Sequence, residues 1–152
     1  MGLDMYLEAR RFMWVFDDGT GRDAEAASKI REALPELGDM KPNYITAEAA
    51  YWRKANAIHK WFVDNVQDGR DDCGHYPVER EQLVTLADIC DEVLKDPSKA
   101  GQLLPTQGGF FFGGTDYDEW YTRNLAHTRD RLRELLARPE LENWEFQYHS
   151  SW

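Results

Sequence analysis

The stretch GLDMYLEA, residues 2–9, alternates apolar and polar side chains without a break. Successive side chains of a β-strand point to opposite faces, so this pattern predicts a half-buried strand. A second alternating stretch, WEFQYH at residues 144–149, predicts another strand with one aromatic face. The side chains expected to face inward on these two strands are Leu3, Met5, Leu7, Ala9, Trp144, Phe146 and Tyr148.

Helical spacing dominates between the two ends. Apolar positions three and four residues apart predict a weak helix over 23–34, a helix over 79–94 with Cys90 on its buried face, and a helix that ends near Arg138. A long helix is expected over 47–66, with Thr46 as its N-cap. Its predicted buried stripe is Tyr51, Ala55, Ile58 and Phe62.

Shorter features complete the pattern. Tyr44-Ile45 and Phe110–Phe112 each predict a short strand, and the Asp- and Gly-rich residues 67–74 predict a loop. Thr115 is expected to cap the last helix, which has acidic residues in its first turn. The predicted inward row of that helix is Tyr117, Tyr121, Leu125, Thr128, Leu132 and Leu135.

These elements favour an α+β fold, in which a mainly antiparallel sheet is covered on one face by about three to four helices. The chain of 152 residues is expected to form a single domain, residues 1–152. The pattern leaves the order of the strands open.

Composition restricts the function. Acidic residues outnumber basic ones by 28 to 18, for a formal charge of −10, so double-stranded nucleic acid and anionic membranes are poor partners. The sequence shows neither a signal-peptide pattern nor an apolar run long enough to span a bilayer. Cys73 and Cys90 are too few for a disulfide framework. We therefore expect a cytoplasmic protein.

Several segments resemble an uncharacterised family of phage and prophage proteins. They are MGLDMYL at 1–7, YWRKANAIHKWFV at 51–63, DCG at 72–74, LLPTQ at 103–107, GFFFG at 109–113, YDEWY at 117–121 and SSW at 150–152. Residues 15–43 fall outside the resemblance and are interpreted as a variable insertion. The resemblance implies a small phage-encoded accessory protein acting in the host cytoplasm, and it transfers no activity to any residue.

A candidate ligand site follows from the block at 51–63. On the predicted long helix, Trp52, Asn56 and His59 would share a face apart from the buried stripe, with Arg53 and Lys60 nearby. Aromatic rings stack on bases, and Arg and Lys pair with phosphate or carboxylate, so this set suits a small anionic or nucleotide-like ligand. Structural packing of the same side chains is the favoured alternative. Gln107, Tyr117 and Trp120, from the later segments, complete the predicted ligand-binding set.

Weaker patterns remain as alternatives. Cys73 and His75, with His59 or Asp72, could hold a metal, and Cys73 with either histidine could act as a nucleophile. No catalytic set, metal site or cofactor is assigned, because each pattern lacks a third partner or a second ligand pair. The glycine runs at 108–109 and 113–114 do not follow a phosphate-loop spacing.

Three hypotheses of function result. The first is a non-enzymatic factor that sequesters a host small molecule, in host takeover or counter-defence. The second is an acidic inhibitor or nucleic-acid mimic that binds a host protein, and the third is a small Cys/His hydrolase or transferase. Whether the chain forms a homo-oligomer stays open.

Overall fold

The computed structural model describes residues 2–152 and shows an α+β fold, a four-stranded antiparallel sheet with five helices among these residues. The predicted fold class is confirmed. The strands are β1 (Asp4–Phe12), β2 (Tyr44–Arg53), β3 (Tyr76–Val78) and β4 (Glu145–Ser151). The α-helices are α1 (Ala24–Ala33), α2 (Asn56–Asn65), α3 (Arg80–Lys95), α4 (Ala100–Leu103) and α5 (Glu119–Leu136).

The chain divides into two compact units. The larger consists of the N-terminal residues through Ala9 together with Glu48–Trp152, and the smaller is Arg10–Ala47. The smaller unit contains the segment 15–43. β1 begins in the larger unit and ends in the smaller one, whereas β2 begins in the smaller unit and ends in the larger one.

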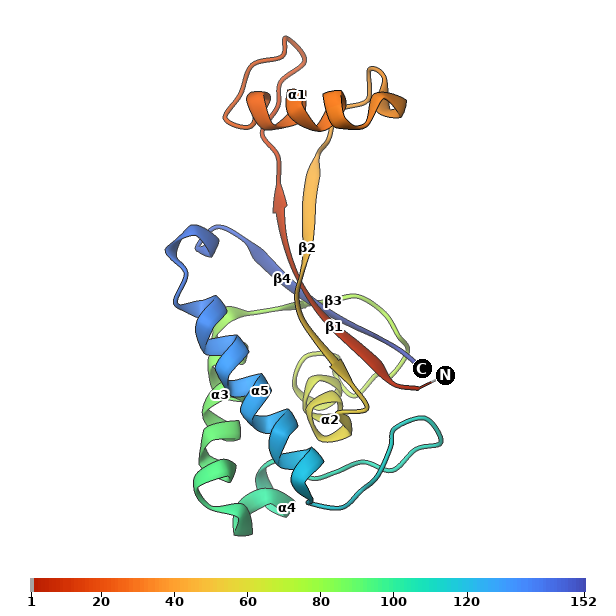
Figure 1. Ribbon diagram of the computed structural model, residues 1–152, viewed down its shortest axis with the longest axis vertical. Coiled ribbons are helices and arrows are strands. Elements are labelled where there is room, and N and C mark those ends of the chain that lie inside the picture. The colour runs from red at the N-terminus through yellow and green to blue at the C-terminus, as the bar shows by residue number, and fades with distance from the viewer. Residues whose placement is uncertain (1) are drawn as a thin grey trace. The chain divides into compact units, whose positions relative to one another are not determined.

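The sheet has the order β2-β1-β4-β3. β3 pairs with β4 antiparallel, with Tyr76 opposite Tyr148 and Val78 opposite Phe146. Figure 1 shows α2, α3 and α5 gathered on one side of the strands. The predicted strands at both ends of the chain are confirmed, because Leu3, Met5, Leu7 and Ala9 of the first, and Phe146 and Tyr148 of the last, are buried.

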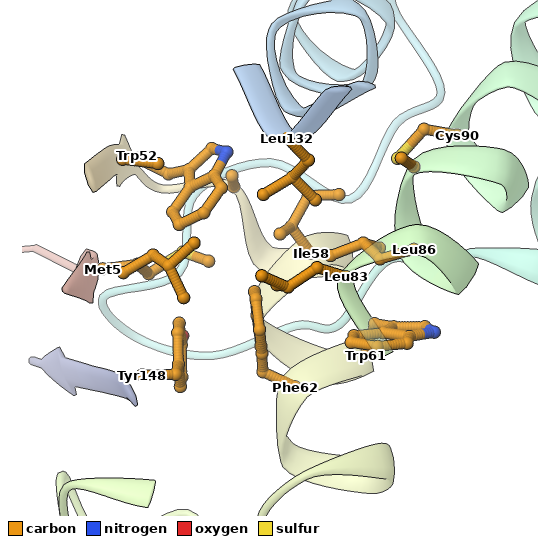
Figure 2. Close-up of a cluster of buried hydrophobic side chains, with 14 of the residues drawn as sticks. Met5, Trp52, Ile58, Trp61, Phe62, Leu83, Leu86, Cys90, Leu132 and Tyr148 are labelled. Atoms are coloured by element: carbon orange, nitrogen blue, oxygen red, sulfur yellow. The ribbon is translucent and has the colours of Figure 1, made fainter. Parts of the chain in front are cut away.

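The core of the larger unit is formed by inward side chains of the sheet and of α2, α3 and α5, together with Ala100 of α4. Figure 2 shows Trp52 and Tyr148 from the strands facing Ile58 and Phe62 of α2, with Leu132 of α5 beside them. The rings of Phe62 and Tyr148 stack with centroids 4.0 Å apart. Aromatic side chains bury large apolar areas, so a chain with moderate numbers of Leu, Ile and Val still closes a core.

α3 and α5 agree with the amphipathic patterns that predicted them, and they pack against each other. Leu83, Leu86 and Cys90 of α3 are fully buried. Burial raises the pKa of the Cys90 thiol to about 12. Cys90 is therefore a core residue, as predicted, and its thiol stays protonated at neutral pH.

The predicted helix over 47–66 is wrong in its first half. Residues 44–53 form strand β2, and the helix begins only at Asn56. The predicted stripe fails at Tyr51, which is exposed, while its neighbour Trp52 is buried. Ala47, Glu48, Ala49 and Ala50 are good helix formers, but pairing with β1 overrides their propensity.

Two smaller predictions around residue 115 are also wrong. Phe110–Phe112 form a turn rather than a buried strand, and Phe110 is 95% exposed while Phe112 is buried. Asp118, not Thr115, caps α5, and its Oδ1 accepts a hydrogen bond from Tyr121 N at 3.0 Å. Tyr117 therefore precedes the helix and is exposed, although the rest of the predicted inward row is buried.

The smaller unit, Arg10–Ala47, is organised around Asp23. The Asp23 carboxylate accepts hydrogen bonds from both terminal nitrogens of Arg11, at 2.8 and 3.0 Å, and from Trp14 N at 2.8 Å. These donors hold the pKa of Asp23 far below its ordinary value. The buried residues of this unit are Met13, Asp23 and Ala27. Its apolar core is small, and we expect the ion pair of Arg11 and Asp23 to contribute to its stability.

Among the helices within residues 2–152, none combines the length and the apolar character needed to cross a bilayer.

Candidate functional site

Three predicted ligand residues, Trp52, Asn56 and His59, are buried. The prediction that they share an outward helix face is wrong, because Trp52 belongs to β2 and the other two to α2. The polar atoms of all three bond to other parts of the protein. Trp52 and His59 therefore have the structural packing role that the sequence offered as the alternative to ligand binding. Asn56 also lines a cavity.

Trp52 points from β2 into the core (Figure 2). Its indole Nε1 donates a hydrogen bond to Thr128 Oγ1 of α5 at 2.9 Å. A buried indole N–H needs such a partner, so this bond fixes α5 against the sheet.

His59 is fully buried between two partners. Its Nδ1 lies 2.7 Å from the Tyr148 hydroxyl and its Nε2 lies 3.0 Å from Asp71 Oδ2. Burial lowers the pKa of His59, and the Asp71 carboxylate opposes that shift in part. In a neutral ring, Nε2–H donates to Asp71 and Nδ1 accepts from Tyr148. Both nitrogens are thus engaged, which leaves neither to activate Cys73.

Asn56 fastens a loop to the start of α2. Its Nδ2 donates to the carbonyl oxygens of Phe112 and Gly114, at 3.0 and 2.8 Å, and its Oδ1 accepts from Gln107 N at 3.0 Å. All the hydrogen-bonding capacity of the amide except one acceptor position is used. The loop of residues 107–114 therefore holds a defined position beside the helix N-terminus.

The other predicted residues are dispersed. Arg53 is exposed, with Nε 4.0 Å from Asp4 Oδ1, and Lys60 bonds Asp64 at 2.6 Å. The backbone N–H of Gln107 donates a hydrogen bond to Asn56 Oδ1, and the ring of Tyr117 packs edge-on against that of Tyr121. Trp120 is exposed on the first turn of α5.

A cavity of about 250 Å³ lies where α2 and α5 begin. Of the predicted residues, Asn56 and Trp120 line it. The volume is slightly below the range of about 300–1,000 Å³ typical of drug-sized ligands, so it suits a compact molecule. All of its lining belongs to the larger unit.

One part of the cavity lining offers groups that can attract an anion. It consists of Lys54 and the first turn of α2, Ala55 to Ile58. The first backbone N–H groups of a helix have no partner within it and carry the positive end of its dipole. No side chain among residues 2–152 caps α2, and its first turn has no acidic residue. This part of the lining can therefore receive an anion.

Lys54 is held in an unusual conformation, with φ of +54°. Its backbone N donates to Leu3 O at 2.7 Å, which fastens it at the end of β2. A Cβ added at Gly113, itself at φ +86°, would come 3.3 Å from Lys54 Cβ. Left-handed backbone at a non-glycine residue carries a cost that the surrounding contacts must offset, and such residues concentrate at functional sites.

Other residues of the lining are acidic and aromatic. Asp116 and Asp118 line the cavity together with Trp120 and Asn124. Asp118 already caps α5, whereas Asp116 is exposed. Behind them, the Tyr121 hydroxyl donates to Leu104 O at 2.8 Å, and burial raises the pKa of Tyr121. Carboxylates in this part of the lining can accept hydrogen bonds from hydroxyl or amino groups.

The sequence did not indicate Lys54, Asp116 or Asp118 as ligand residues. A usable signal was present at Lys54-Ala55-Asn56, where a two-residue alternation changes to helical spacing without a capping Ser, Thr or Asp before Asn56. From the sequence, the acidic residues were interpreted as favourable for the α5 dipole or as solvated. Their convergence with Lys54 depends on how α5 packs.

The candidate site is thus a cavity at the N-termini of two helices. Part of its lining suits an anion, and another part suits hydrogen-bond donors of a ligand. No family model, no curated protein and no solved structure matches this chain.

Proposed function

We propose that the protein binds a compact anionic ligand of nucleotide type in the cavity at the N-termini of α2 and α5, and acts by sequestering it. The observation that carries this proposal is that an uncapped helix N-terminus, Lys54 and two carboxylates line one cavity of about 250 Å³. An anion alone would not need the carboxylates. A ligand with both an anionic group and hydroxyl or amino groups uses both parts of the lining.

The chemistry of the lining favours one orientation. Lys54 and the α2 N–H groups would receive a phosphate or carboxylate. Asp116 and Asp118 would accept hydrogen bonds from ribose-type hydroxyls, and the exposed face of Trp120 would stack on a flat ring. The volume limits the ligand to about the size of a nucleoside monophosphate.

Binding without turnover is favoured by the lining. Among the described residues around the cavity there is no cysteine or histidine, so no thiol–imidazole pair faces it. The resemblance of the sequence to phage and prophage proteins supports a role directed at a host metabolite. A strongly acidic chain also disfavours nucleic-acid polymers relative to a small ligand held by specific contacts.

The test is a panel of nucleoside monophosphates, diphosphates and inorganic phosphate, measured by thermal unfolding and calorimetry. A ligand at 100 times its Kd should add about 2.7 kcal/mol to the free energy of unfolding. Lys54→Met keeps the aliphatic stem and removes the charge, and should weaken binding about tenfold or more. Lys60→Met, which removes a similar lysine outside this cavity, should not. Absence of any stabilising ligand, or equal losses in both variants, would refute the proposal.

A second candidate function is supported by the smaller unit. Trp14, Phe16 and Met40 are exposed within Arg10–Ala47. Exposed aromatic side chains are typical of protein interfaces, and a charge of −10 favours a basic partner. Under this hypothesis Trp14→Ala with Phe16→Ala should abolish capture of a basic host protein while Lys54→Met does not. Capture that persists in the double variant would contradict it.

A further inference from the structure

We infer that Glu8, His75 and His149 form a binding site for a divalent first-row transition-metal ion such as Zn²⁺. One donor atom from each residue lies within 4.8 Å of the others. The site belongs to the larger unit and is independent of the cavity proposed for the nucleotide-type ligand. None of its residues lines that cavity.

The sheet itself brings these side chains together. Glu8 lies on β1 and His149 on β4, which are neighbours in the sheet. The β3–β4 register pairs Tyr76 with Tyr148, so His75, one residue earlier, falls opposite His149. Glu8 alternates with the buried Leu7 and Ala9, and His149 with the buried Tyr148 and Ser150. All three therefore lie on the face of the sheet away from the core.

The donor atoms of these three residues need to move only slightly closer together to bind one metal ion. Glu8 Oε1 lies 3.4 Å from His149 Nε2, and Glu8 Oε2 lies 3.9 Å from His75 Nδ1. Donors about 2.0–2.2 Å from one Zn²⁺ ion are separated from each other by roughly 3–3.5 Å. The His75 and His149 rings now stack, with centroids 4.2 Å apart, so His75 must turn to direct its lone pair at a shared ion. Its side chain is 56% exposed and is free of the core, which permits that turn.

Neighbouring groups orient the other two ligands. Gln147 Nε2 donates to Glu8 Oε2 at 2.5 Å, and the Tyr6 ring stacks on His149 with centroids 4.7 Å apart. Such contacts around ligands fix their orientation and raise metal affinity. The side chains of Glu8 and His149 are 22% and 19% exposed, so an ion can enter and keep open positions for water or another ligand.

The ligand set selects the class of metal. Two imidazoles and one carboxylate suit Zn²⁺, Fe²⁺, Co²⁺ and related ions, whereas Mg²⁺ and Ca²⁺ prefer oxygen ligands alone. Cys73 is not part of this group, so the site differs from the Cys73–His75 pair that the sequence suggested.

The experiment is a calorimetric titration of the metal-free protein with Zn²⁺, together with the visible absorption of bound Co²⁺. We expect one ion per chain with a Kd in the micromolar range or below. His75→Ala and Glu8→Gln should each weaken Zn²⁺ binding about tenfold or more. His75 is exposed, so its variant should keep the fold, which circular dichroism verifies.

Matched controls separate this site from adventitious binding. His127→Ala removes an exposed histidine of α5, Cys73→Ser removes the nearby thiol, and Lys54→Met alters the separate cavity; each should leave the Kd for Zn²⁺ within about twofold. Failure to saturate at one ion per chain would overturn the inference. So would a His75→Ala variant that binds Zn²⁺ as tightly as the parent, or a Cys73→Ser variant that loses the ion.

Discussion

The buried polar groups of the two units lie in different surroundings. In Glu48–Trp152, buried polar side chains such as Trp52 Nε1 and Asn56 bond inside an extensive apolar core. In Arg10–Ala47, the apolar core is minimal and one carboxylate, Asp23, gathers the donors. Aromatic content alone therefore does not indicate burial. Trp52 is 2% exposed, whereas Trp14 is 53% exposed.

The largest expected effect is a difference in the free energy of unfolding between variants of these two tryptophans. Trp52→Ala should lower the free energy of unfolding by about 3–5 kcal/mol, because it opens a core cavity and removes the donor to Thr128. Trp14→Ala should lower it by less than about 1 kcal/mol. Urea denaturation of both variants measures the contrast. Similar losses would show that the small unit is as tightly packed as the large one.

The next effect concerns the carboxylate of the small unit. Asp23→Asn weakens the paired hydrogen bonds from Arg11 and should cost about 2 kcal/mol locally. Hydrogen exchange should accelerate for amides within Arg10–Ala47 and stay unchanged in α3 and α5. Asp17→Asn, at an exposed position paired with Lys41, is the matched control and should leave exchange unaltered. Faster exchange throughout the chain would mean that the units do not open separately.

A smaller effect is the pH dependence that His59 imposes on the large unit. Burial lowers the pKa of His59 from its ordinary value of 6.5, so the unfolded chain takes up the proton at higher pH than the folded chain. The stabilisation is complete above pH 6.5 and is lost as the pH falls below it, at no more than about 1.4 kcal/mol per pH unit.

Urea denaturation between pH 8 and 5 measures this slope. His59→Gln should be less stable at pH 7, because Asp71 and Tyr148 lose their partner, but should show a flatter profile below pH 6.5. His127→Gln, at an exposed position, serves as the control and should keep the wild-type profile. An unchanged slope in His59→Gln would assign the acid sensitivity to other groups.

Sequence periodicity predicted those elements whose inward face repeats regularly. β1, β4, α3 and most of α5 agree with it, because one buried face imposes a period of two on a strand and about 3.6 on a helix. β2 was misread since Ala47 to Ala50 favour a helix, while the neighbouring β1 offers backbone partners that local propensity does not register. The exposed Phe110 likewise shows that an apolar triplet need not be a buried strand.

The candidate site was predicted less well than the fold. Asn56 and Trp120 were singled out and line the cavity, but the reason given for Asn56, an outward helix face, was wrong. Lys54 and Asp116 are separated by about sixty residues of sequence, and nothing local to either indicates the other. Glu8, His75 and His149 are just as widely spaced, and only the β3–β4 register and the β1–β4 pairing bring them together.

Composition and periodicity were enough to predict the α+β class, the inward faces of β1, β4, α3 and most of α5, the buried Cys90 and the acidic charge, because both are properties of the chain read along one dimension. The folded chain alone reveals that residues 44–53 form a strand, that His59 is enclosed, and that Lys54 and Asp116 line the same cavity. Those outcomes depend on partners far away in sequence, whose backbone and side-chain groups compensate the cost of burying polar atoms.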